Sequence, residues 1–426
     1  MENNKFKAIY YSLNTIFRLY SGFIGATFIV FFYSCGFNEV TTNIIVSTSL
    51  ITIFFAEIPT GAISDVFGRR FAVIASGVML LFANIIFLFG NHYYLFILAQ
   101  IFVGIAYAFF SGSLDSWMVE HIKLDKINLD HVFIVKNKWV NGGVIVGGLI
   151  GGVLSDINPR SIFLLSIVSS LVYVVIAYRN ITDREVETEP WIAQDTSVVK
   201  DKIIRGFLSM ASTIRYSYNF VVHDKMARGI VLFNSALTFC FSAIFVFWQP
   251  ILFDYMNQSD YYLLGIAWVF MQSSMFLGTL LSHKLIKWFK NSRFAVLYGV
   301  TFLIGIVIVV GVKIGGFWAI GITLIIFEVG IGVLTPLKEA SLNYFVEDEK
   351  KRATILSFQS MFIYIFNYFS MILMGFLSTR FTKLTTWVIS GLLLIILSIL
   401  YGVRINNTNK AFQLKVSNDA LDLNDI

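Results

Sequence analysis

The chain has 426 residues, of which 57% are hydrophobic and only 14% charged, and its formal net charge is +6. This composition excludes a water-soluble globular protein, which needs far more charged surface. The basic charge does not indicate nucleic-acid binding, because no basic segment forms a domain apart from the apolar runs. Cys35 and Cys240 are too few for a disulfide framework or a metal cluster, and we expect no cofactor.

Twelve apolar runs are long enough to cross a bilayer as helices. A polar segment separates them into two groups of six and carries either an amphipathic helix along the membrane surface or a plain connection. The sequence therefore predicts an all-α integral membrane protein with twelve transmembrane helices in two six-helix halves. Its parts are an N-terminal six-helix bundle at 1–178, a cytoplasmic linker at 179–228, a C-terminal six-helix bundle at 229–404 and a cytoplasmic tail at 405–426. In chain order, the predicted spans are 13–36, 41–63, 71–90, 94–115, 139–156, 161–178, 229–252, 261–283, 294–312, 317–337, 355–377 and 384–403.

The distribution of basic residues orients the predicted bundle. An even number of spans places both termini on one side of the membrane. With the N-terminus in the cytoplasm, nearly all lysines and arginines lie on that side, where the basic loops face anionic headgroups. We therefore expect a monomeric, multi-pass protein of the cytoplasmic (cell) membrane, in contact with the lipid bilayer and with both termini in the cytoplasm. The exceptions to the charge distribution are Arg160, Lys313, Arg380 and Lys383.

A short charged turn, GAISDVFGRR at 61–70, lies between the second and third predicted spans. It resembles the signature turn of the major facilitator superfamily, Gly-x-x-x-Asp-x-x-Gly-Arg-Lys/Arg, at that family's characteristic place. The layout of six spans, linker and six spans agrees with this resemblance over roughly residues 8–404. The resemblance implies a secondary transporter in which Asp65 and Arg69 help latch the two halves in the outward-facing state. The alternative is a basic turn that only sets the orientation.

Further residues complete the predicted latch. The glycine that opens the turn permits a close backbone approach, and the second glycine shapes a tight turn. The resemblance places two carboxylates of the fourth span beside the arginines of the turn, and a basic residue at the start of the eleventh span offers a counterpart in the second half. The predicted latch comprises Gly61, Asp65, Gly68, Arg69, Arg70, Asp115, Glu120 and Arg352.

The fifth predicted span, NGGVIVGGLIGGVLSD, is rich in glycine. It partly resembles the Gly-Pro-x-x-Gly-Gly motif of the superfamily's antiporter branch, and this resemblance favours an efflux-type transporter. Two sets of glycines recur every four residues, so two adjacent ridges are bare and neighbouring helices can approach closely. A bending or gating role is the alternative. One ridge comprises Gly143, Gly147 and Gly151, and the other comprises Gly148, in place of the motif's proline, and Gly152.

Few polar groups lie inside the predicted spans, and ionisable groups there are costly and mark function. Glu328 lies about 16 Å into the tenth span at 1.5 Å per residue, so it is the best candidate to gain and lose a proton. Glu57, beside Pro59, could bind a cation or a proton, and Gln249, beside Trp248, could line an outer gate. The alternatives are glutamates that only tie helices together and an interfacial tryptophan anchor.

Energy for transport has to come from a gradient, because the chain has no phosphate-binding loop. The resemblance, the aromatic content and the sparse charge favour proton-driven export of an amphiphilic or lipophilic small molecule. Arg18 is expected at the cytoplasmic end of the first span, so no arginine is expected at mid-depth to hold a phosphorylated solute. The alternatives are a proton-coupled importer of a small nutrient and a non-transporting receptor. An enzyme is not expected.

Overall fold

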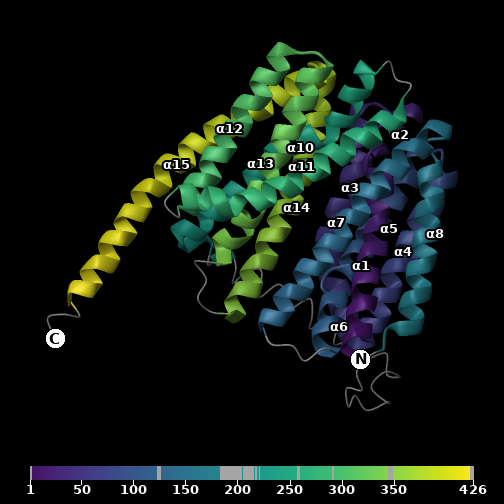
Figure 1. Ribbon diagram of the computed structural model, residues 1–426, viewed down its shortest axis with the longest axis horizontal. Coiled ribbons are helices and arrows are strands. Elements are labelled where there is room, and N and C mark those ends of the chain that lie inside the picture. The colour runs from purple at the N-terminus through teal and green to yellow at the C-terminus, as the bar shows by residue number, and fades with distance from the viewer. Residues whose placement is uncertain are drawn as a thin grey trace.

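The computed structural model describes residues 2–121, 126–182, 221–256, 260–289, 292–343 and 349–422, with the isolated positions 204, 215, 218 and 219. Long apolar runs become helices in a membrane because the bilayer core offers no water to hydrogen-bond. A helix satisfies its backbone N–H and C=O groups internally. Figure 1 shows the resulting helical bundle. The N-terminal half contains α1 (Glu2–Gly25), α2 (Phe28–Ser34), α3 (Glu39–Phe67), α4 (Arg69–Phe89), α5 (Tyr93–Phe110), α6 (Ser113–His121), α7 (Lys126–Ile157) and α8 (Ser161–Asn180). The C-terminal half contains α10 (Lys225–Tyr255), α11 (Tyr261–Trp288), α12 (Arg293–Ile314), α13 (Phe317–Asn343), α14 (Glu349–Arg380) and α15 (Lys383–Asp422).

The predicted set of twelve spans is confirmed. Among the described residues, 11 helices are long and apolar enough to cross a membrane, and the bent pair α1–α2 makes up to 12. The first predicted span is therefore two helices, which meet at a bend of 48° after Gly25. The fourth span is also interrupted, because Gly112 adopts a φ of 75° between α5 and α6.

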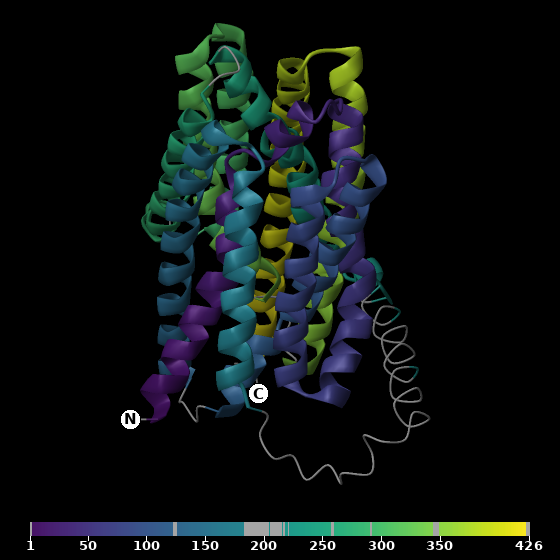
Figure 2. The ribbon, with the colours of Figure 1, turned by 90° about the vertical axis from the view of Figure 1, so that its right-hand side faces the viewer.

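Most of the predicted linker at 179–228, with its possible amphipathic helix, lies outside the described residues. The C-terminal half begins with α10 at Lys225, and α15 continues to Asp422 through the segment predicted as a tail. Figure 2 shows the N and C ends of the chain toward the same end of the bundle. This end is termed the N-terminal face, and the opposite end is termed the distal face.

Each half has its own cluster of buried side chains. Phe17, Phe87 and Trp117 belong to the N-terminal cluster, and Trp387 belongs to the C-terminal cluster. Val30 of α2 lies in the C-terminal cluster. The bend in the first span therefore lets α2 pack on both clusters: Phe28, Phe31 and Phe32 stay in the N-terminal one, while the helix also contacts α10 of the other half.

The halves meet along two helix pairs, α7 with α11 and α3 with α14. Their ribbons converge at the distal face and diverge toward the N-terminal face (Figure 1). Hydrogen bonds reinforce the distal contact: Asn43 Nδ2 donates to the backbone oxygen of Met371 at 2.9 Å, and Trp268 Nε1 donates to that of Val144 at 3.2 Å. The halves are thus held together toward the distal face.

Candidate functional site

The charged turn joins α3 to α4 at the N-terminal face. Gly68 has a φ of 90° and a ψ of 164°, a backbone conformation that a residue with a Cβ rarely adopts. Arg69 then reaches back along the turn. Its Nη1 lies 2.9 Å from Oδ1 of Asp65 and donates to Oγ of Ser64 at 3.0 Å, and its Nε lies 3.5 Å from Oε1 of Glu120. Arg69 therefore ties α3 to α6 within the N-terminal half.

Two other residues of the predicted latch have different partners. Asp115 was expected beside the arginines of the turn, but it accepts a 2.5 Å hydrogen bond from the Tyr10 hydroxyl and lies 3.4 Å from Nζ of Lys136. The reason is the break before α6, which starts a new short helix whose first turn faces α1 and α7. Arg70 donates to the backbone oxygen of Tyr178 at 3.0 Å, which links α4 to α8.

Two further positions of the predicted latch are Gly61 and Arg352. A Cβ at Gly61 would meet no atom of the described residues within 4 Å, so none of them makes the expected close approach to this glycine. Arg352 falls within α14, but its side chain lies outside the described residues. Between described residues, the contacts of Arg69 all stay inside the N-terminal half.

The two glycine ridges of α7 face different helices. The first ridge packs against α1, and an added Cβ at Gly147 would lie 3.1 Å from the Cα of Gly22. The second ridge packs against α11 of the other half. There, a Cβ at Gly152 would lie 2.7 Å from the Cα of Gly265, and a Cβ at Gly148 would collide with the ring of Trp268. One ridge therefore serves packing within a half, and the other serves packing between halves.

Arg18 lies near the middle of the first span. Because α1 begins at Glu2, Arg18 is about 24 Å along it at 1.5 Å per residue. Because the polar residues before it are also helical, Arg18 lies further from the start of its helix than the predicted span at 13–36 implied. Its Cζ lies 5.2 Å from the ring centre of Tyr107 and 5.9 Å from that of Phe110. With the residues that the structure describes, Arg18 forms no hydrogen bond or ion pair.

A tyrosine of the opposite half lies in electrostatic range of this arginine and of a glutamate on α3. Glu57 on α3 is half-buried, and no described residue pairs with its carboxylate. Tyr364, on α14 of the opposite half, lies within electrostatic range of Glu57, Arg18 and Tyr107. We term these four residues the central cluster. It combines one basic, one acidic and two phenolic side chains between the halves.

Glu328 lies apart from this cluster, on α13. It is 4% exposed, and within the described part of the chain nothing hydrogen-bonds to it or pairs with it. Its neighbour Phe327 packs edge-on against Phe241 of α10, with ring centres 5.3 Å apart. The described side chains provide no group of three His, Cys, Asp or Glu that could hold a metal ion. Glu328 is thus an isolated, buried carboxyl group.

The sequence matches a known protein family. The model of the Major Facilitator Superfamily matches residues 11–346. The chain belongs to the major facilitator superfamily. It is also 24% identical over 135 residues to an uncharacterised MFS-type transporter of Methanocaldococcus jannaschii. That match covers 32% of this chain and 34% of the relative, so it spans about a third of each.

Solved structures of superfamily transporters share the fold. The nucleoside transporter NupG matches with a TM-score of 0.74 and 12% identity, over 93% of this chain and 99% of its own. A POT family transporter in complex with 5-aminolevulinic acid matches with a TM-score of 0.71 and 13% identity, over 93% and 95%. A D-xylose-proton symporter matches with a TM-score of 0.68 and 12% identity, over 93% and 96%. These similarities establish the fold, and with the family they identify a multi-pass membrane transporter.

In this superfamily member, Gln249 of α10 covers the break in the first span. Its Oε1 accepts a hydrogen bond from the backbone nitrogen of Ile29 at 2.8 Å, and its Nε2 donates to the backbone oxygen of Gly25 at 2.8 Å. The break frees these backbone groups, which need partners inside a membrane. Gln249 is 4% exposed and Trp248 only 2%. This patch is therefore a buried joint between the halves, and Trp248 is not an interfacial anchor.

A charged joint lies at the rim of the distal face. Nζ of Lys383, at the start of α15, lies 3.8 Å from Oε1 of Glu39 and 3.0 Å from Oδ2 of Asp254. It also lies 5.3 Å from the ring centre of Tyr33. Glu39 and Tyr33 belong to the other half, so Lys383 joins the two. Sequence reasoning noted Lys383 only as an exception to the charge distribution, because its partners come from three distant segments.

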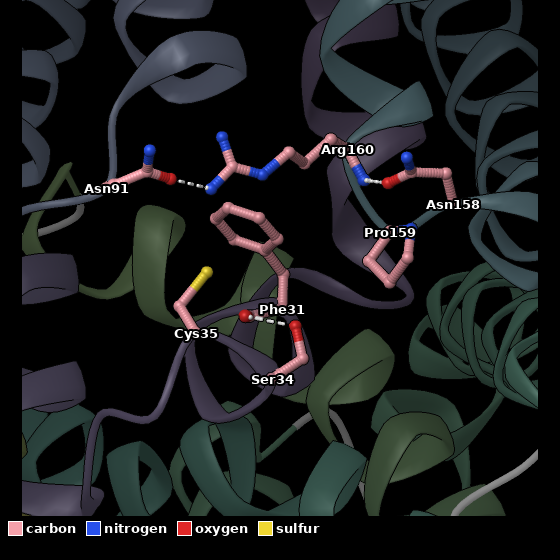
Figure 3. A pocket seen from close by; sticks show the side chains of 7 residues that line it. All are labelled: Phe31, Ser34, Cys35, Asn91, Asn158, Pro159 and Arg160. Carbon is pink, nitrogen blue, oxygen red and sulfur yellow. Dashed lines mark hydrogen bonds between the residues drawn. The ribbon is translucent and has the colours of Figure 1, made fainter.

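The distal face of the transporter also carries a polar pocket of about 290 Å³ (Figure 3). Arg160 reaches across it, donating from Nη1 to the backbone oxygen of Leu88 at 2.6 Å and from Nη2 to Oδ1 of Asn91 at 2.5 Å. Phe31 and Cys35 line the pocket below this side chain. Arg160 therefore ties the end of α4 to the start of α8, which explains a basic residue at this face.

Proposed function

We propose that the protein is a proton-driven secondary transporter that exports an amphiphilic small molecule across the cytoplasmic membrane by alternating access. The observation that carries this proposal is the central cluster, in which Arg18 and Glu57 lie between the halves without described partners. Ionisable groups inside a membrane bundle are costly and usually mark a path for solute or ions. The antiporter-like glycine pattern of α7 supports export.

The N-terminal face is cytoplasmic in this proposal, because the basic residues concentrate there. The joints at Gln249 and Lys383 then close the outer side, and the solute path opens toward the cytoplasm. In the opposite state, Asp65 and Arg69 engage the C-terminal half near Arg352 while the N-terminal face closes. Their present contacts inside one half fit a latch that has been released.

Glu328 carries the proton in this proposal. An ionised carboxylate without a partner is expensive inside a membrane protein, so the neutral form suits the buried site. Release of the proton requires water or another polar partner, which a change in the packing of α13 can provide. Glu57 is the second candidate, since its carboxylate also lacks a described partner.

The test is proton movement driven by a solute in inside-out vesicles acidified inside and loaded with a pH-sensitive dye. Fluorescent amphiphiles and antibiotics are added to the outside. We expect an exported compound to dissipate the pH gradient, Glu328→Gln to abolish this response and Asp65→Asn to slow it. Asp260→Asn, which changes a carboxylate at the distal face, is the matched control and should leave the response unchanged.

The direction of transport is tested in energised cells that express the protein. Depletion of the compound, reversed by a protonophore, is expected for export. Accumulation would indicate a proton-coupled importer instead. If no compound moves protons in the vesicles, the transport proposal fails and a non-transporting receptor is favoured. An unchanged response in Glu328→Gln would remove that residue from coupling.

A further inference from the structure

The guanidinium of Arg18 rests on a fixed aromatic platform. Phe110, one of its two rings, stacks on Phe17 with ring centres 3.9 Å apart and planes 1° apart. Tyr107, the other ring, shares a 2.5 Å hydrogen bond between its hydroxyl and that of Ser21. The Cζ of Arg18 lies within about 6 Å of both ring centres, within the range of cation–π attraction. The guanidinium also carries a planar fork of five N–H donors that matches a carboxylate. No described residue accepts a hydrogen bond from that fork.

Glu57 supplies the opposite charge in the same region. Tyr364 is within electrostatic range of both Glu57 and Arg18, so the two charges border one part of the interface between the halves. They do not form an ion pair with each other in this conformation. Each charge therefore keeps its capacity to bind a group on another molecule.

We propose that the solute is an aromatic zwitterion whose carboxylate binds Arg18 and whose ammonium group binds Glu57. This inference rests on the proposed transport function and names the substrate class of the same site. The fork of Arg18 binds a carboxylate in bidentate fashion, and the phenol rings of Tyr107 and Tyr364 suit both an ammonium group and an aromatic body. A lipophilic cation would leave Arg18 without a partner and would be repelled by it, so such a cation is a poorer fit than a zwitterion.

The test measures binding of matched probes to the purified full-length protein, without any gradient. The probes are phenylalanine, tryptophan and naphthylalanine, each with its methyl ester, which is a cation, and its N-acetyl derivative, which is an anion. We expect each zwitterion to bind at least about tenfold more tightly than both derivatives, because each derivative leaves one charge of the site without a partner. Equal binding of an ester and its parent zwitterion, or no binding of any zwitterion, would overturn the inference.

Substitutions of Arg18 and Glu57 test which charged group of the solute each residue binds. Arg18→Gln should weaken binding of the zwitterions about tenfold or more and should not weaken binding of the methyl esters, which lose a repelling charge. Glu57→Gln should likewise weaken binding of the zwitterions without weakening that of the N-acetyl derivatives. Arg18→Lys keeps the charge but loses the fork, so an intermediate affinity is expected. Arg160→Gln, at the distal pocket, is the matched control and should bind like the wild type. Unchanged zwitterion affinity in a folded Arg18→Gln protein, judged by its melting curve, would contradict the assignment.

Failure of this inference and failure of the transport proposal give different results. Zwitterion binding without proton movement in vesicles would contradict proton-driven transport and leave the substrate site standing. Proton movement driven only by cations that lack a carboxylate would support transport and overturn the zwitterion assignment.

Discussion

The two glycines of the charged turn have different physical environments. Gly68 adopts a φ of 90°, which carries a backbone penalty for any residue with a Cβ. Gly61 is exposed, and a methyl group added there would lie in open space. One glycine is thus needed for the shape of the chain, and the other is free of contacts in this conformation.

We expect Gly68→Ala to lower the free energy of unfolding by about 1–3 kcal/mol, the usual cost of a strained backbone conformation. Gly61→Ala should change it by less than about 0.5 kcal/mol, because its methyl group meets no atom. Melting curves of the purified variants in detergent measure both effects. Equal destabilisation by the two alanines would show that backbone strain at Gly68 is not the cause. A transport defect in a stable Gly61→Ala protein would indicate close packing at this glycine in the opposite state.

At the scale of helices, α7 packs closely against a different helix on each of two sides. Its first glycine ridge lies against α1, and its second lies against α11 across the interface. Bare ridges allow close helix contacts in a membrane, where packing rather than the hydrophobic effect holds helices together. The second ridge therefore contributes to closure of the distal face.

Gly148→Leu is expected to displace Trp268 and to separate α7 from α11. Gly142→Leu adds the same side chain to the same helix where a Cβ meets nothing within 4 Å, and it serves as the control. Spin labels at Ile157 and Trp318, both 79% exposed, would report the separation of the halves near the distal face. We expect a longer distance in Gly148→Leu and the wild-type distance in Gly142→Leu. A wild-type distance in both variants would refute the role of this ridge in closure.

Gln249 supplies hydrogen-bond partners for two backbone groups at the bend between α1 and α2. Gln249→Ala leaves the backbone nitrogen of Ile29 and the oxygen of Gly25 without these partners. The expected cost is about 1–3 kcal/mol of unfolding free energy for each buried group left unsatisfied. Gln272→Ala, on α11, should cost less than about 0.5 kcal/mol. Thermal or denaturant unfolding in detergent compares the two, and similar stabilities would argue against the proposed capping role.

At the scale of the whole molecule, the two faces of the bundle differ. Toward the distal face the halves share hydrogen bonds and the ion pairs of Lys383, whereas the described contacts of Arg69 stay within one half. The proposed alternating-access cycle requires both sets of contacts to be weak enough to break. The distal joints therefore help set the population of this conformation.

Lys383→Gln should shift this population modestly toward a state that is open at the distal face. Partly exposed ion pairs contribute about 0.2–1 kcal/mol, which corresponds to a change of up to about fivefold in population. The same spin labels measure the shift, and high salt should reduce the difference between the variant and the wild type. Lys313→Gln removes an exposed charge from the distal end of α12 and should have no effect. Equal shifts in both variants would point to net charge instead of the joint at Lys383.

Local sequence patterns were sufficient for the membrane spans and for the shape of the charged turn. Apolar length determines which segments cross a bilayer, and the need for a positive φ restricts Gly68, so both follow from neighbouring residues alone. The partners of polar side chains did not follow in this way. Asp115 contacts Tyr10 and Lys136, which lie on α1 and α7, so its partners depend on which distant helices pack beside the first turn of α6.

By itself, the sequence determined twelve predominantly apolar spans in two halves, the family signature between α3 and α4, and the two bare ridges of α7. Only the tertiary structure decided that one ridge serves the opposite half, that Tyr364 of the C-terminal half lies in electrostatic range of both Arg18 and Glu57, and that Lys383 joins the halves. The physical reason is that hydropathy and glycine spacing act within a single helix. The depth of a charge and its partners depend on where each helix begins and which distant helices pack beside it.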